Sequence, residues 1–199
     1  TKGYDKNDVK IVGNPDGINV FTSNFNYSLS SDNVLYIAQP LVELNIIKAE
    51  KFKFWARELN NVLAKNQNLL IRPHPKSDLN FLRECFPEAS FEYSENISLF
   101  LIIGHYSTYC EKTQYLVPTI LVKFAETDRF TEDPMFFKSI KIDHKNKEEI
   151  KKYLLKKECF QNFSPNLPKK YKLDYYKNVT DYILKIINEK WHRIFNNNN

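Results

Sequence analysis

The sequence predicts an α/β fold in which a doubly wound, mostly parallel sheet carries helices on both faces. Strand-like and helix-like segments alternate along the chain, which is the pattern of βαβ units. The apolar run at 98–104 is continuous rather than alternating, as expected of a strand that is covered on both faces. We expect residues 1–195 to form one domain that closes with a long helix, and residues 196–199 to form a disordered tail.

The first half of the chain contains three predicted strands and one long helix. A β-branched run at 9–15 ends on Gly-Asn-Pro, and the Asn- and Ser-rich stretch at 16–31 reads as a loop. A second strand covers 33–40. Apolar residues then recur at helical spacing from 47 to about 64, which predicts an amphipathic helix. A third strand at 68–75 ends in two prolines.

The second half continues the alternation of strands and helices. Ser and Asp before an apolar stretch predict a helix start near residue 77. The remaining elements are expected, in chain order, as a strand at 89–94, a strand at 98–108, a short helix at 108–116, strands at 117–124 and 137–143, a charged helix at 146–157 and a final helix at 173–195.

Composition bounds the class of protein. The chain has 199 residues, of which 42% are apolar and 15% aromatic, enough for a sizeable core. Its net charge of +5 could attract phosphates, nucleotides, nucleic acid or an anionic membrane surface. Much of the excess lies at 145–157 and 167–172, which we interpret as a solvated basic face. No aromatic and basic RNA-binding motif supports nucleic-acid binding.

The cysteines and the hydropathy indicate a cytoplasmic protein. Cys85, Cys110 and Cys159 are odd in number and widely spaced, as expected of reduced thiols. No apolar stretch approaches the roughly 20 residues that cross a bilayer, and no signal-peptide pattern opens the chain. The basic charge would allow peripheral association with the inner membrane. Because the chain begins at Thr1 rather than Met, we expect it to be trimmed or part of a longer protein.

The turn after the third strand, Arg72-Pro73-His74-Pro75, holds a histidine between two prolines. Proline fixes its own φ and restricts the residue before it. His74 therefore leaves the strand on a stiff backbone, from which it could donate a hydrogen bond or a proton to a phosphate oxygen. An ordinary turn with an exposed imidazole is an equally good interpretation of this stretch.

The stretch Gly104-His105-Tyr106-Ser107-Thr108 follows the continuous apolar strand. Ser107 or Thr108 is a natural N-cap, and free N–H groups at a helix start can bind an anion. Capping alone is the commoner role of such hydroxyls. Because the carboxyl ends of parallel strands meet at one edge of the sheet, this turn and the His74 turn could surround one phosphate.

Taken in order, "LYIAQPLVE", "LLIRPHPKSD" and "LIIGHYSTYCEKTQYLVPTILV" resemble the C-terminal half of GT-B glycosyltransferases that make bacterial surface glycans. The resemblance is to sialyltransferases and polysialyltransferases with an HP motif and a downstream Ser/Thr motif, and it covers roughly residues 9–125. It implies a Rossmann-like domain that binds CMP-sialic acid and transfers the sugar, without a metal or other cofactor, to a glycan acceptor of the capsule or lipopolysaccharide.

The resemblance also implies roles for particular residues. His74 would contact the CMP phosphate and protonate or stabilise the departing nucleotide, and Ser107 and Thr108 would bind the same phosphate. Gln39 and Pro40 would lie at the rim of the cleft, and Glu126 would reach the ribose. The other implied nucleotide-binding positions are Arg72, Pro73, Pro75, Gly104 and His105.

One departure from the family and several alternatives stay open. The family takes its general base from an N-terminal domain that is not evident here, so this chain would need such a partner domain. A CDP-glycerol glycerophosphotransferase or a Kdo transferase would use similar loops. From another class, a non-catalytic basic α/β module would bind its partner through residues 145–172. A thiol enzyme using Cys110 is a more remote alternative, because no base is visibly placed for it.

Overall fold

The computed structural model describes residues 26–63, 67–92, 96–127, 138–166 and 183–185. The chain divides into two compact units, one formed by residues 23–166 and the other by residues 1–22 together with 167–199. In the second unit, the described residues 183–185 are helical and expose Ile183 and Leu184. The strand expected at 9–15, most of the helix expected at 173–195 and the expected tail lie outside the described residues.

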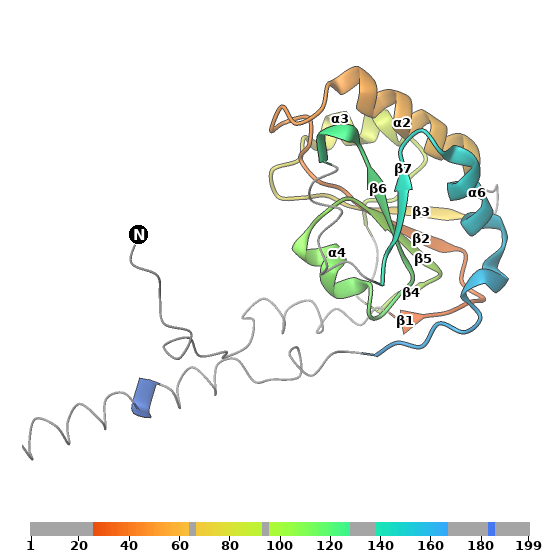
Figure 1. Cartoon of the computed structure of the whole chain (residues 1–199). Helices are drawn as coiled ribbons and strands as arrows, with labels where there is room; N and C mark the ends of the chain where they lie inside the picture. The colour runs from red at the N-terminus through yellow and green to blue at the C-terminus, as the bar shows by residue number, and fades with distance from the viewer. Residues whose placement is uncertain (1–25, 64–66, 93–95, 128–137, 167–182, 186–199) are drawn as a thin grey trace, which may run out of the picture. The chain divides into compact units, whose positions relative to one another are not determined.

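A parallel sheet forms the centre of the first unit (Figure 1). Every strand pair in this sheet is parallel, and the spatial order is β3-β2-β5-β6-β7. The strands are β2 (Asn33–Ile37), β3 (Asn68–Arg72), β5 (Leu101–Gly104), β6 (Thr119–Lys123) and β7 (Ile140–Asp143). Two short strands, β1 (Asn26–Tyr27) and β4 (Ser98–Leu99), form a second parallel sheet. The prediction of an α/β protein with a mostly parallel sheet is therefore confirmed.

Helices flank both faces of the sheet (Figure 1). The helices α2 (Ala49–Val62), α3 (Leu79–Cys85) and α6 (Lys147–Leu155) contribute buried side chains to one core cluster, which also contains Val34 and Tyr36 of β2. The helix α4 (Thr108–Thr113) contributes Cys110 to a second cluster with Leu35 and Ile37. Because neighbouring residues of a strand point to opposite faces, the two clusters lie on opposite sides of the sheet. Short 3₁₀ helices, η2 (Ala125–Thr127) and η4 (Lys157–Phe160), complete the described elements.

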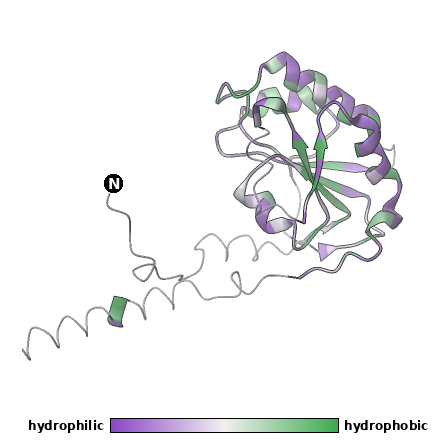
Figure 2. Cartoon of the chain, in the orientation of Figure 1, coloured by the Kyte–Doolittle hydropathy of each residue, from purple (hydrophilic) through white to green (hydrophobic). Residues whose placement is uncertain are grey.

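Local sequence explains these elements. The helix α2 buries Phe52, Trp55, Leu59 and Val62, a spacing that places them on one face of a helix. Figure 2 shows that the strands at the centre are largely apolar, whereas the helices around them combine apolar and polar residues. The helix α3 begins where the Asp78 carboxylate accepts hydrogen bonds from the backbone N–H groups of two following residues. Within the described residues, none of the helices has the length and apolar character needed to cross a bilayer.

Three expectations need correction. The stretch 16–31, expected as a loop, contains β1 at its described end. Of the strand expected at 89–94, the described residues 89–92 form only one bridge, between Leu70 and Ser90. The Ser90 hydroxyl donates to the carbonyl oxygen of Glu92 and accepts from its N–H group, so the chain turns away from the sheet after one pair. The strand expected at 98–108 breaks at Phe100 and ends at Gly104, because Ser107 already caps α4.

Gly104 lets α4 lie close to the sheet. A Cβ atom at this position would stand 2.5 Å from the Cys110 Sγ atom. We therefore expect Gly104→Ala to lower the free energy of unfolding by about 1–3 kcal/mol, the usual cost of overpacking a core. Urea denaturation measures this change. In a double-mutant cycle with Cys110→Ala, the effect of Gly104→Ala should shrink; strict additivity would show that the crowding lies elsewhere.

Candidate functional site

Strand order singles out one point on the carboxyl edge of the sheet. After β2 the chain places β3 on one side of it, and it then places β5, β6 and β7 in succession on the other side. The direction of winding therefore changes between β2 and β5. In open parallel sheets, ligands bind outside the carboxyl ends of the strands at such a switch point.

A pocket of about 350 Å³ lies at this point. Its lining comes mainly from the segments that follow β2, β3 and β5, so the topology brings together residues far apart in the sequence. The volume falls within the range usual for small-molecule sites. The lining residues are Gln39, Pro40, Leu41, Leu44, Ile46, His74, Lys76, His105, Tyr106 and Thr127.

His74 is held in one tautomer by the turn that it begins. The backbone N–H of Lys76 donates to the His74 Nδ1 atom at 3.1 Å, and the N–H of Ser77 donates to the His74 carbonyl oxygen at 2.8 Å. Because Nδ1 accepts a hydrogen bond, the neutral ring carries its proton on Nε2. The pocket therefore has a partly exposed imidazole whose Nε2–H can donate to a ligand.

His105 lines the same pocket but is 1% exposed and fully bonded to the protein. Its Nδ1 atom lies 3.1 Å from the Val122 carbonyl oxygen, and its Nε2 atom lies 2.9 Å from the Tyr36 hydroxyl oxygen. Since a carbonyl oxygen only accepts, Nδ1 donates to Val122 and Nε2 accepts from Tyr36. Burial lowers the pKa of His105 to about 4. His105 is therefore a neutral wall of the pocket.

The residues expected at the second turn serve its local structure. The Ser107 hydroxyl oxygen accepts a hydrogen bond from the Cys110 N–H at 3.1 Å, which makes Ser107 the N-cap of α4. Thr108 is the first residue of this helix, and Gly104 is the last residue of β5. Neither Gly104 nor Ser107 lines the pocket. Burial raises the pKa of Cys110 to about 12, which keeps its thiol protonated and inert as a nucleophile.

Two other predicted residues are occupied by protein contacts at the edge of the site. The Arg72 guanidinium lies 3.9 Å from the centre of the Tyr109 ring and donates from Nη1 to the Tyr109 hydroxyl at 3.0 Å. The Glu126 carboxylate accepts from the Lys51 ammonium at 2.7 and 2.9 Å, and this contact lowers the pKa of Glu126. Both residues are exposed, so neither contact excludes a ligand.

Of the remaining predicted residues, some line the pocket and others only flank the residues that line it. Gln39 lines the pocket, while its amide nitrogen donates to the carbonyl oxygen of Ala38 at 3.2 Å. Pro73 and Pro75 flank His74 and do not themselves line the pocket. The structure therefore brings Gln39, Pro40, His74 and His105 to one pocket. Of the other predicted residues, Arg72, Pro73, Pro75, Gly104, Ser107 and Glu126 do not line it.

Sequence reasoning missed the apolar wall of the pocket, formed by Leu41, Leu44 and Ile46 in the loop after β2. The Ile46 N–H donates to the Leu41 carbonyl oxygen at 2.8 Å, and Asn45 takes a positive φ of 54°, which Asn tolerates better than most residues. The sequence signal for this wall was the stretch "LVELNII" after Pro40, which is rich in apolar residues. This stretch ends before α2 begins.

The pocket combines an imidazole donor, one lysine and an apolar wall. None of the lining residues that the structure describes is a carboxylate. Within the described ranges, no group of three His, Cys, Asp or Glu side chains could hold a metal ion. Comparison of the chain with models of known protein families, with curated proteins and with solved structures finds no match.

The neutral state of His105 makes stability depend on pH. An exposed histidine has a pKa of about 6.5, against about 4 in the fold, so the unfolded chain binds a proton over this window and the folded chain does not. This contribution is fully present above about pH 6.5 and is lost as the pH falls to about 4, a difference of about 3 kcal/mol. Urea denaturation at several pH values measures the slope.

The matched variant for this test is His105→Asn. It removes the titrating group, so we expect a flatter fall in the free energy of unfolding between pH 6.5 and 4.5, whatever its stability at neutral pH. Burial also lowers the pKa of His144, which contributes in the same direction in both proteins. If the free energy of unfolding of His105→Asn fell with pH as steeply as that of the unchanged protein, the lowered pKa of His105 would not be the cause.

Proposed function

We propose that this chain carries the nucleotide-binding domain of a Rossmann-like, GT-B-type glycosyltransferase that binds a CMP-activated sugar. The observation that carries the proposal is the pocket at the β2–β5 switch point, with the Nε2–H of His74 available to a ligand. The donor would be CMP-sialic acid, and the acceptor a bacterial surface glycan. We expect the domain to act in the cytoplasm, at the inner face of the membrane that receives the glycan.

The charges around the pocket support an anionic ligand. Lys76 lines it, and Arg72 lies at the end of β3, beside the turn that bears His74. During sugar transfer, the bond between the anomeric carbon and the phosphate oxygen breaks and its electron pair moves to the CMP phosphate. A hydrogen bond from the His74 Nε2–H would stabilise this developing charge. Because His74 keeps Nδ1 as an acceptor, hydrogen-bond donation is the role that its geometry favours most directly.

The apolar wall supports binding of the less polar part of such a ligand. Leu44 is an apolar side chain that is 52% exposed. It lines the pocket together with Ile46 and Tyr106. A base or the apolar face of a sugar could cover this surface. The acceptor hydroxyl needs a general base, and no carboxylate lines the described pocket. We therefore assign the base to a partner domain.

The non-catalytic basic module is less well supported. Two lysines of the stretch 145–157 are neutralised by ion pairs, Lys147 with Glu58 at 2.8 Å and Lys157 with Asp32 at 2.7 Å. Such pairing fits a solvated surface better than one prepared for an anionic partner. A CDP-glycerol glycerophosphotransferase or a Kdo transferase would use the same pocket, so the choice of nucleotide and donor has to be measured.

Calorimetric titration of the full chain with CMP, CDP, UDP and GDP tests the proposal. We expect CMP to bind most tightly, and His74→Ala to weaken CMP binding by about tenfold or more, because a hydrogen bond to a charged group is lost. His74 lies in a turn and is partly exposed, so the fold should survive. The matched control is Lys151→Ala on the exposed side of α6, for which we expect unchanged affinity.

Three results would count against the proposal. Tighter binding of UDP or GDP would exclude a CMP-activated donor. Absence of any nucleotide binding would remove the function altogether. If lysine variants in 145–157 abolished binding while His74→Ala did not, the basic module would be the better interpretation.

A further inference from the structure

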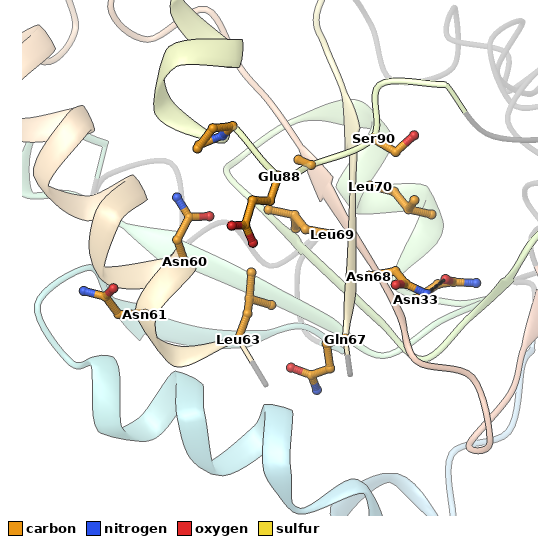
Figure 3. Close-up of a pocket in the computed structure, with 12 residues that line it drawn as sticks. Asn33, Asn60, Asn61, Leu63, Gln67, Asn68, Leu69, Leu70, Glu88 and Ser90 are labelled. Atoms are coloured by element: carbon orange, nitrogen blue, oxygen red, sulfur yellow. Dashed lines mark hydrogen bonds between the residues drawn. The ribbon is translucent and has the colours of Figure 1, made fainter. Parts of the chain in front are cut away.

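A second pocket lies at the opposite, amino edge of the sheet. It has a volume of about 710 Å³ and is lined where β2 and β3 begin, where α2 ends and where the chain leaves α3 (Figure 3). Side-chain amides dominate its polar lining. The lining residues are Asn33, Asn60, Asn61, Leu63, Gln67, Asn68, Leu69, Leu70, Pro87, Glu88, Ala89 and Ser90.

Protein contacts use amide nitrogens of this lining as donors. The Asn60 Nδ2 atom donates to the Cys85 carbonyl oxygen at 2.9 Å, and the Gln67 Nε2 atom donates to the Leu154 carbonyl oxygen at 2.7 Å. The Asn68 Nδ2 atom donates to the Asn33 Oδ1 atom at 3.1 Å. Because a carbonyl oxygen only accepts, the first two contacts fix which end of each amide is nitrogen.

The fixed orientation of Asn60 turns its amide oxygen toward the pocket. In Figure 3 the Asn60 amide and the Glu88 carboxylate point into the same open space from opposite sides. Glu88 is exposed and makes no hydrogen bond or ion pair with the described part of the chain. A ligand group that donates hydrogen bonds could contact both acceptors at once. The negative charge of the carboxylate favours a donor that is positively charged.

The rest of the lining suits an aliphatic chain and disfavours an anion. Leu63, Leu69, Pro87 and Ala89 give the pocket apolar walls, against which methylene groups can lie. Among the lining residues that the structure describes, none is a lysine, an arginine or a histidine. A sugar would need donors as well as acceptors from the protein, and much of the donor capacity of these amides is already used.

We propose that this pocket binds an alkylammonium group, either of a small aliphatic diamine or of a lysine side chain. The ammonium would donate to the Glu88 carboxylate and to the Asn60 Oδ1 atom, while its methylenes would cover Leu63 and Leu69. This proposal does not depend on the nucleotide proposal, because the two pockets lie at opposite ends of the strands.

Titration of the ¹⁵N-labelled full chain with 1,5-diaminopentane, followed by NMR, tests the proposal. We expect saturable shifts in the Asn60 and Asn61 side-chain amides, with a dissociation constant in the millimolar range. Glu88→Gln should weaken binding by about tenfold, since it removes a charged acceptor. The matched control is Glu148→Gln, which removes the same charge from an exposed position in the first turn of α6 and should leave the affinity within about twofold.

Two further probes sharpen the result. The neutral analogue 1,5-pentanediol should bind more weakly than the diamine, and Nα-acetyl-lysine methylamide tests whether a protein side chain is the better source of the ammonium. Tighter binding of one of the two amines identifies the source. The proposal is overturned if the diamine gives no saturable shifts, if the diol binds equally well, or if Glu88→Gln and Glu148→Gln weaken binding to the same extent.

Discussion

The burial of β2 and β5 on both faces is the constraint on which the rest of the structure depends. Val34, Leu35 and Tyr36 in β2, and Leu101, Ile102 and Ile103 in β5, have no exposed surface. A strand that is covered by apolar side chains on both faces admits few polar side chains, because each would need a buried hydrogen-bond partner. Polar chemistry is therefore confined to the strand ends, where the chain turns toward solvent. Both pockets lie at these ends.

The Tyr36–His105 pair is a polar contact inside this apolar core. Burial raises the pKa of Tyr36 well above its usual value, so its hydroxyl keeps the proton that it donates to His105. The His105 ring in turn donates to the Val122 carbonyl oxygen. Because every polar atom in this chain of hydrogen bonds has a partner, the cost of burial is largely offset. The pair connects three segments: β2, β6 and the turn that follows β5. It thereby fixes the wall that His105 forms in the pocket at the carboxyl edge of the sheet.

The sequence allowed the central strands to be predicted, because continuous apolar runs such as Leu101–Ile103 depend only on local composition. It also pointed to His74, whose two flanking prolines act on the adjacent backbone. It did not show that His105 is bonded on both sides, because Tyr36 and Val122 lie far from it in the chain and meet it only in the folded sheet. The apolar loop that ends at Ile47 was missed for a similar reason: the Glu43 carboxylate holds it by accepting from the Asp78 N–H, a contact that no local pattern reveals.

The register of β2 with β3 decides which polar residues meet at each edge of the sheet. Parallel pairing sets Asn33 opposite Asn68 at one end and Ile37 opposite Arg72 at the other. At the first end, the Asn68 Nδ2 atom donates to the Asn33 Oδ1 atom, and both residues line the pocket that also contains Glu88. At the second end, Arg72 leads into the turn that carries His74 and Lys76. A shift of one residue would break both arrangements, since it would move every side chain of the strand to the other face. One register therefore places the amides around Glu88 at one edge of the sheet and the turn with His74 and Lys76 at the other.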